Sequence, residues 1–135
     1  MKPTHLAVLF LSIGLIFLLS SITPALAQAK PDFATLRGRW VRPDGGYVIE
    51  IQSVDAGGRM QAAYYNPNPI NVSRAEAGLV GSVVTVFIEL RGPGYPGSTY
   101  RLIHDPTSDV LKGVYHHAGL QQDFSVVFHR GKREQ

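Results

Sequence analysis

Short apolar runs, separated every few residues by Gly, Pro, Asn or Asp, dominate the chain beyond residue 36 and restrict what it can fold into. The first unit is GRWVRPDGGYVIEI, residues 38–51, in which residues 43–46 separate two alternating runs. Proline fixes one backbone angle and glycine tolerates positive φ, as a tight turn between antiparallel strands requires. The unit therefore predicts a β-hairpin, and the later segments repeat its form.

The same pattern predicts eight strands and no helix of useful length. The expected strands are residues 36–42, 47–54, 59–66, 70–77, 82–91, 98–104, 110–117 and 121–130. Residues 92–97 are predicted to be a six-residue loop because they are rich in Gly and Pro. Eight strands with short connections predict an all-β, eight-stranded antiparallel up-and-down (meander) barrel, because such a sheet closes at about eight strands. A two-sheet sandwich is the alternative, but its connections are usually longer.

The N-terminus carries the pattern of a secretory signal peptide. Lys2 precedes an apolar run over residues 6–22, which Pro24 and the small-residue tripeptide 25–27 follow. We expect cleavage after Ala27; an uncleaved anchor is the alternative, because about 17 apolar residues are near the lower limit for spanning. The expected organisation is a signal peptide (1–27), a lead-in (28–35) whose Phe33 packs under the barrel, the β-barrel domain (36–130) and a basic tail (131–135).

Composition narrows the class of protein further. The chain has no cysteine, so a periplasmic or secreted domain of this size must be held together by its core alone. The formal net charge of +3 is weak and scattered, unlike the basic patch of a nucleic-acid-binding protein. We therefore expect no nucleic-acid partner, and no membrane association after cleavage of the signal peptide.

Three short motifs resemble those of a known group of barrels. Gly38-Arg39-Trp40 resembles the G-x-W with which calycin-type barrels (lipocalins, fatty-acid-binding proteins, avidins) begin. Segments 60–64 (MQAAY) and 111–115 (LKGVY) resemble the apolar-x-small-x-aromatic strands of avidin-like barrels. The resemblance implies an eight-stranded barrel in which Trp40 packs across a closed end against Arg130. Avidins surround biotin with several tryptophans, and this chain has one, so biotin is not the expected ligand.

A meander places its connections at alternating ends of the barrel. Turns 55–58, 78–81 and 105–109 are therefore expected at the closed end, and loops 43–46, 66–69, 92–97 and 118–120 at the mouth. The period of two assigns to the deeper interior Trp40, Ile49, Ile51, Met60, Ala62, Val84, Val86, Leu102, Leu111, Gly113, Val126 and Phe128. Ile88, Leu90 and Phe124 are expected nearer the mouth.

The polar side chains near the mouth form the candidate ligand-binding site. They are Arg42, Tyr47, Tyr64, Asn66, Tyr100, Tyr115, His117 and Gln122. Tyrosines that converge beside an arginine and amides suit a small amphipathic or aromatic molecule, with its apolar body inward and its polar group at the rim. The alternative is that the tyrosines fill the core of a barrel that holds no ligand.

Neither a metal site nor catalysis is expected. His116 and His117 are adjacent, so on one strand they face opposite sides and cannot chelate one ion together. The aspartates of the turns are explained by bonds to their own backbone, and no phosphate loop or hydrolase motif occurs. We therefore expect no cofactor and no enzymatic activity.

A protein-interaction module is the alternative function. A secreted hydrolase inhibitor or an assembly subunit would use loops 66–69 and 92–97, with Tyr95 exposed. Apolar residues at outward positions predict a patch that suits a protein partner or a homodimer; they are Val41, Val48, Val83, Phe87 and Val114.

Overall fold

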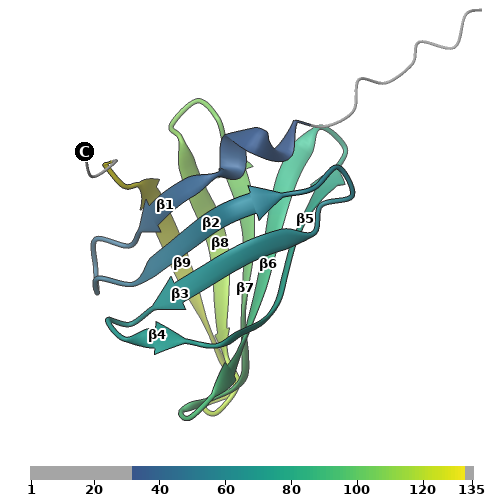
Figure 1. The fold of residues 1–135 in the computed structure, drawn as a ribbon. Coiled ribbons are helices and arrows are strands. Elements are labelled where there is room, and N and C mark those ends of the chain that lie inside the picture. Colours follow the sequence, from purple (N-terminus) through teal and green to yellow (C-terminus); the bar gives the residue numbers. More distant parts are fainter. Residues whose placement is uncertain (1–31, 133–135) are drawn as a thin grey trace, which may run out of the picture.

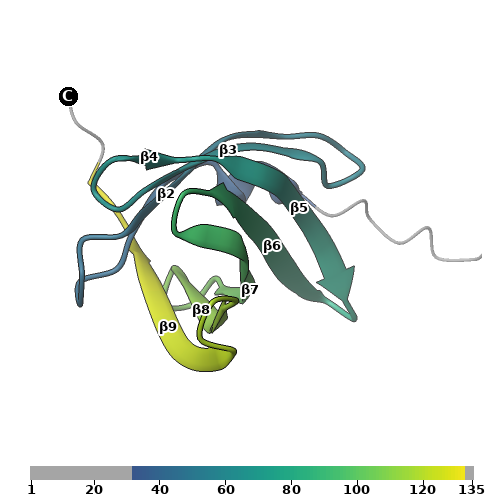
Figure 2. The same ribbon diagram turned by 90° about the horizontal axis from the view of Figure 1, so that it is seen from below.

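Antiparallel hairpins follow one another along the chain and curve into a nearly closed barrel (Figures 1 and 2). The computed structural model describes residues 32–132. A short 3₁₀-helix, η1 (Phe33–Leu36), precedes the strands β1 (Gly38–Val41), β2 (Val48–Val54), β3 (Met60–Tyr65), β4 (Pro69–Ile70), β5 (Val72–Val80), β6 (Val83–Gly92), β7 (Tyr95–Asp105), β8 (Val110–His117) and β9 (Gln122–Arg130). Their order in the sheet is β4-β3-β2-β1-β9-β8-β7-β6-β5. The predicted all-β up-and-down fold is confirmed.

The predicted number of eight strands is wrong, because the strand expected over 70–77 is broken at Asn71. Before the break, β4 pairs with β3; after it, β5 pairs with β6. The break lets the chain leave one side of the opening in the sheet and join the other. On the far side of that opening, the residues that lead into β3 meet β5 at the bridge between Arg59 and Glu76 and at the bond from the Ala77 N–H to the Gly58 carbonyl (2.6 Å). We call this meeting point the seam.

The predicted six-residue loop over 92–97 is also wrong. Strand β6 extends through Gly92 and β7 begins at Tyr95, so Pro93 and Gly94 alone make the turn. Proline followed by a glycine with φ +78° fits a type II turn. Composition misleads here because glycine and proline are tolerated at the tip of a hairpin as well as in a loop.

The chain enters the barrel through a helical turn rather than a strand at Leu36. The carboxylate of Asp32 accepts a hydrogen bond from the Ala34 N–H (2.9 Å) and caps η1. Phe33 and Leu36 are buried in the core, as expected of Phe33. The predicted signal peptide, the start of the lead-in and residues 133–135 of the tail lie outside the described residues. Among residues 32–132, no helix is long and apolar enough to cross a membrane.

The alternation of side chains places the core inside the barrel. Of the residues predicted for the deeper interior, nine are buried: Trp40, Ile49, Ile51, Met60, Val86, Leu102, Leu111, Val126 and Phe128. Ala62 and Val84 are partly buried and pack against them. A Cβ atom at Gly113 would collide with the Arg101 carbonyl, so β7 and β8 approach closely where this glycine lies.

One end of the barrel is closed by a tryptophan and an arginine. Trp40 is fully buried, and its indole N–H donates to the Leu36 carbonyl (2.9 Å). The Arg130 guanidinium lies 4.1 Å from the Trp40 ring centroid and donates to the carbonyls of Arg37 and Thr35. It also donates to Asp109, and this bond holds the pKa of that carboxyl below its usual range. The Trp40–Arg130 packing implied by the family resemblance is thus present.

The outward apolar residues differ in exposure. Val83 and Val114 are exposed, at 40% and 39%, but Val48 is buried. Phe87 is covered by two guanidinium groups, those of Arg74 and Arg101, at 5.0 and 5.2 Å from the ring centroid. The expected patch therefore does not form from all five residues.

Candidate ligand-binding site

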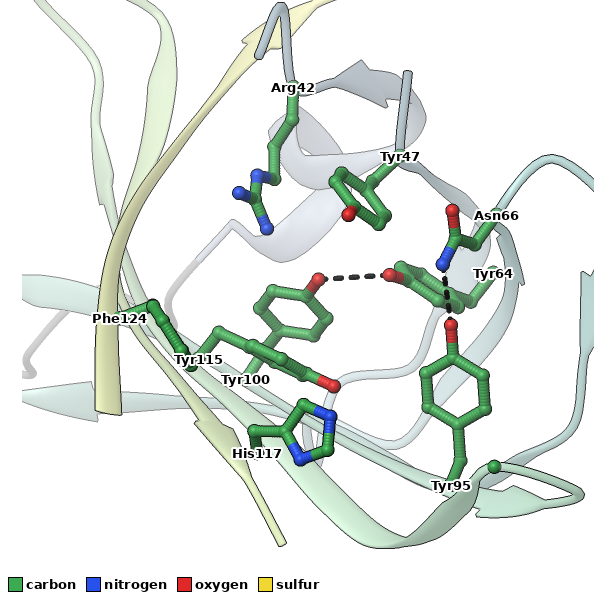
Figure 3. Close-up of a pocket in the computed structure, with 10 residues that line it drawn as sticks. Arg42, Tyr47, Tyr64, Asn66, Tyr95, Tyr100, Tyr115, His117 and Phe124 are labelled. Atoms are coloured by element: carbon green, nitrogen blue, oxygen red, sulfur yellow. Dashed lines mark hydrogen bonds between the residues drawn. The ribbon is translucent and has the colours of Figure 1, made fainter. Parts of the chain in front are cut away.

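A cavity of about 320 Å³ lies at the end of the barrel opposite Trp40 (Figure 3). Residues of the strands and of the loops beside them line it: Arg42, Tyr47, Tyr64, Asn66, Gly94, Tyr95, Tyr100, Tyr115, His117 and Phe124. The volume is near the lower limit for pockets that hold small molecules. Five of the six tyrosines of the chain converge on this one cavity.

Three aromatic rings on neighbouring strands form one wall. Tyr100 on β7 pairs with Tyr115 on β8, which pairs with Phe124 on β9, so the three side chains point to the same face of the sheet. The ring centroids of Tyr100 and Tyr115 are 4.6 Å apart, and those of Tyr115 and Phe124 are 6.4 Å apart. Since adjacent strands fix these spacings, the wall is preformed.

The opposite wall is built on β3. Tyr64 on β3 extends towards β7, and its hydroxyl lies 3.0 Å from that of Tyr100. Both side chains are almost fully buried, with exposed fractions of 1% for Tyr64 and 0% for Tyr100. Burial raises the pKa of Tyr100 to about 12, although hydrogen bonds with Tyr64 and Arg42 oppose that shift. Burial raises the pKa of Tyr64 as well, so both hydroxyls are protonated at neutral pH.

Arg42 brings a positive charge to the cavity. Its guanidinium lies 4.4 Å from the centroid of the Tyr47 ring and forms a two-pronged ion pair with Asp44 (2.9 and 2.6 Å). Burial opposes the charged form, but bonds with Asp44 and Tyr100 outweigh it and raise the pKa of Arg42. Arg42 is therefore always charged, and its side chain is 11% exposed while that of Asp44 is 61% exposed.

Two further polar groups define the rim. The Asn66 side-chain amide donates to the hydroxyl of Tyr95 (2.6 Å). The Nδ1 atom of His117 accepts a hydrogen bond from the Leu120 N–H (3.1 Å). The hairpins place both residues at the rim, since Asn66 comes directly after β3 and His117 is the last residue of β8.

The structure brings seven of the eight predicted site residues into one cavity. The exception is Gln122, which does not line it. Gln122 has the inward parity of Phe124 on β9, but it pairs with His117 at the tip of the hairpin, and its side chain is exposed beyond the rim. Gln122 therefore lies outside the lining of this cavity.

Sequence reasoning missed Tyr95, which it placed in an exposed loop. The ladder between β6 and β7 shifts register after Leu90, where one extra residue on β7, Gly97, is accommodated. Such a bulge reverses the alternation, so Tyr95 and Tyr100 both face the cavity although five positions separate them. The signal in the sequence is Gly97 itself, because a glycine within an alternating run often marks a bulge. In the structure its φ is +99°.

The chemistry of the lining favours binding. The side chains around the cavity are aromatic rings, hydroxyls, an amide, an imidazole and a guanidinium, without a carboxylate. Within residues 32–132, no three His, Asp or Glu side chains gather as a metal site would require. Comparison of the chain with protein-family models, curated proteins and solved structures finds no match.

Proposed function

We propose that this protein is a periplasmic or secreted carrier that binds a small amphipathic or aromatic molecule in the tyrosine-lined cavity. The observation that carries the proposal is the convergence of five tyrosines and Arg42 on one cavity, at the end opposite the closed one. Aromatic walls with a few placed polar groups are typical of pockets for small organic ligands.

The position of the cavity within the barrel supports the same function. The interior near Trp40 is filled by side chains, and the ring pair of Tyr100 and Phe128 (5.3 Å) separates that core from the cavity. A ligand would therefore enter only the part of the barrel on the cavity side of these two rings. The calycin-type resemblance of residues 38–40 supports a carrier too, because members of that group hold ligands within a barrel.

Catalysis is not proposed for this site. General acid–base or nucleophilic catalysis needs a nucleophile beside a base, or paired carboxylates in a pocket. The cavity lining contains neither arrangement. The titratable side chains there are explained as binding groups and as partners of one another.

The first test is native mass spectrometry of the protein purified from the cells that produce it. We expect extra mass of a few hundred daltons that disappears on denaturation, and the released molecule is then identified. If the chain is isolated without such mass and no small molecule in an extract of those cells restores it, the carrier function is wrong.

A pair of variants then tests the site itself with the released molecule. Tyr115→Ala removes a partly buried ring from the wall and should weaken binding at least about tenfold, as the loss of a stacked aromatic contact does. Tyr65→Ala is the matched control, because Tyr65 is also partly buried on a strand but does not line the cavity. Equal weakening by both variants would show that the cavity is not the site.

The alternative function is a protein-interaction module or a homodimer. It is favoured by one observation, the exposed apolar residues Ile103, Val114 and Val127 on the outer face of β7, β8 and β9. Val114 pairs with Arg101, two residues before Ile103 on β7. It also pairs with Ser125, two residues before Val127 on β9, so the three apolar side chains lie close together on one face. The native mass spectrum decides here as well, since a dimer or a protein complex without small-molecule mass would support this function.

A further inference from the structure

The polar groups of the cavity offer several N–H and O–H donors. Arginine only donates, and it has five N–H groups, of which the ion pair with Asp44 uses two. The hydroxyl pair of Tyr64 and Tyr100 uses one of its two protons and leaves the other free to donate. Asn66 already donates to Tyr95, so the Tyr95 hydroxyl keeps its own proton for another acceptor.

The bond at His117 fixes the role of its second ring nitrogen. Because Nδ1 accepts from the Leu120 N–H, the proton of the imidazole lies on Nε2. The ring extends into the cavity (Figure 3), so Nε2–H is a further donor there. A ligand that complements these donors must therefore supply acceptors.

The charge of the cavity points the same way. Arg42 is nearly buried, and its guanidinium extends into the cavity between Tyr47 and Tyr100 (Figure 3). Its partner Asp44 does not line the cavity and is largely exposed. The Asp44 carboxylate bonds only with Nε and one Nη atom of Arg42. Because Arg42 has five N–H groups, its bonds with Asp44 and Tyr100 leave others that can bind an anion on the cavity side.

We propose that the ligand is a planar aromatic carboxylate, whose carboxylate accepts hydrogen bonds from Arg42 and whose ring packs among Tyr47, Tyr100 and Tyr115. This inference rests on the proposed function and names the class of ligand. Charge-assisted bonds from arginine are strong and directional, and the aromatic rings provide the apolar contact. A cationic ligand would face Arg42 without a carboxylate in the lining to offset it.

Three probes with one ring system separate charge from shape. They are 2-naphthoate, 2-naphthamide and 2-naphthylmethylammonium, each titrated by calorimetry into the ligand-free protein at neutral pH. We expect 2-naphthoate to bind at least about tenfold more tightly than the neutral amide, which corresponds to ~1.4 kcal/mol, and the ammonium probe to bind most weakly. Equal affinity for the acid and the amide would overturn the carboxylate assignment and leave the carrier function standing.

Two variants test the role of Arg42. Arg42→Gln keeps a hydrogen-bonding side chain but removes the charge, so it should abolish the preference for naphthoate over naphthamide. Arg101→Gln is the matched control, because Arg101 is exposed on the outer face of β7 and lies over Phe87. It makes the same change in net charge and should retain the preference.

A third variant keeps the proposal testable if Arg42→Gln fails to fold. Asp44→Asn removes the carboxylate that competes for the guanidinium, so it should tighten naphthoate binding by a few-fold and leave amide binding unchanged. A purely structural role for the Arg42–Asp44 pair predicts the opposite sign, a loss of affinity for both probes. Absence of saturable binding by all three probes would instead count against the proposed function.

Discussion

At the scale of single residues, the tyrosine pair at the base of the cavity places polar groups in the core without adding charge. A buried hydroxyl without a partner costs about 1 to 3 kcal/mol, and Tyr64 and Tyr100 avoid that cost by bonding each other across the barrel. The bond joins β3 to β7, which are not neighbours in the sheet. It therefore fixes the width of the cavity as well as satisfying the hydroxyls.

The raised pKa values of these tyrosines predict the response of the protein to alkali. The folded state holds the Tyr100 proton more tightly than the unfolded chain does, so its stabilisation is complete below about pH 10 and is lost as the pH rises above that value. For Tyr100, whose pKa is raised to about 12, the loss approaches about 3 kcal/mol near pH 12. Tyr64 contributes in the same direction.

Tyrosinate absorbance measures this effect directly. At about pH 10.5 the native protein should show less tyrosinate than the same chain in urea, and the missing signal should appear together with loss of the β-sheet circular dichroism. Tyr64→Phe should narrow the difference between the native and the unfolded titration. Superimposable curves for the native and the urea-unfolded chain would contradict the buried hydroxyl pair.

Most of the candidate site was predictable from residue type and strand parity. Tyr64, Tyr100 and Tyr115 share the parity of the buried residues on their own strands, so alternation alone places them inside. Parity gives the wrong assignment for Tyr95 because a bulge reverses the alternation. It also does so for Gln122, because β9 extends beyond the cavity at that end. Parity predicts to which side of the sheet a side chain points, but not which residue of the strand is the last one inside the barrel.

At the scale of the elements, the closed end depends on Trp40. The ring is fully buried between η1 and Arg130, and it makes an edge contact with His104 at 5.7 Å. Trp40→Ala should therefore lower the free energy of unfolding by about 3 to 5 kcal/mol in urea denaturation, as large aromatic deletions in cores do. Trp40→Phe keeps a ring but loses the bond to the Leu36 carbonyl, and its loss should be smaller. A loss below about 1 kcal/mol for the alanine variant would show that the Trp40 ring does not stabilise the closed end.

The seam between β3 and β5 depends on a glycine. At Gly58, φ is +89° and a Cβ atom would collide with the Ala77 carbonyl across the seam. Gly81 is the matched control, since its φ is +61° and a Cβ atom there meets nothing within 4 Å. Both alanine variants incur the cost of positive φ, but Gly58→Ala must also separate the strands. We expect its free energy of unfolding to fall at least about 1 kcal/mol further, and equal losses would show that the seam is not tightly packed.

The elements were predictable where turns are marked by composition and strands by alternation. Strand β8 was predicted with its observed bounds, 110–117, because polar turns flank an alternating run. The break at Asn71 was not, because it arises from the geometry of the closing sheet rather than from a residue that cannot extend a strand. Strand identity is local information, while the place where a sheet splits depends on distant partners.

At the scale of the whole molecule, the barrel consists of two meanders with narrow junctions. Strands β1 to β4 form one meander and β5 to β9 the other. They join between β1 and β9 through the pairs Trp40↔Arg130 and Val41↔His129, and between β3 and β5 at the seam. By contrast, β8 and β9 are paired along eight consecutive positions. The two meanders therefore share a core but few backbone bonds.

This division predicts how the barrel opens, and amide hydrogen exchange can follow it strand by strand. Strands β7 and β8 have long ladders on both sides, so their amides should exchange slowest, through global unfolding. The amides of β3 and β5 that face the seam have few bonds and should exchange faster than those of β7 and β8. Gly58→Ala should accelerate β3 and β5 selectively, while Gly81→Ala should not. If β3 and β5 are instead protected as strongly as β7 and β8, the barrel unfolds as one unit and the seam is no weaker than the ladders.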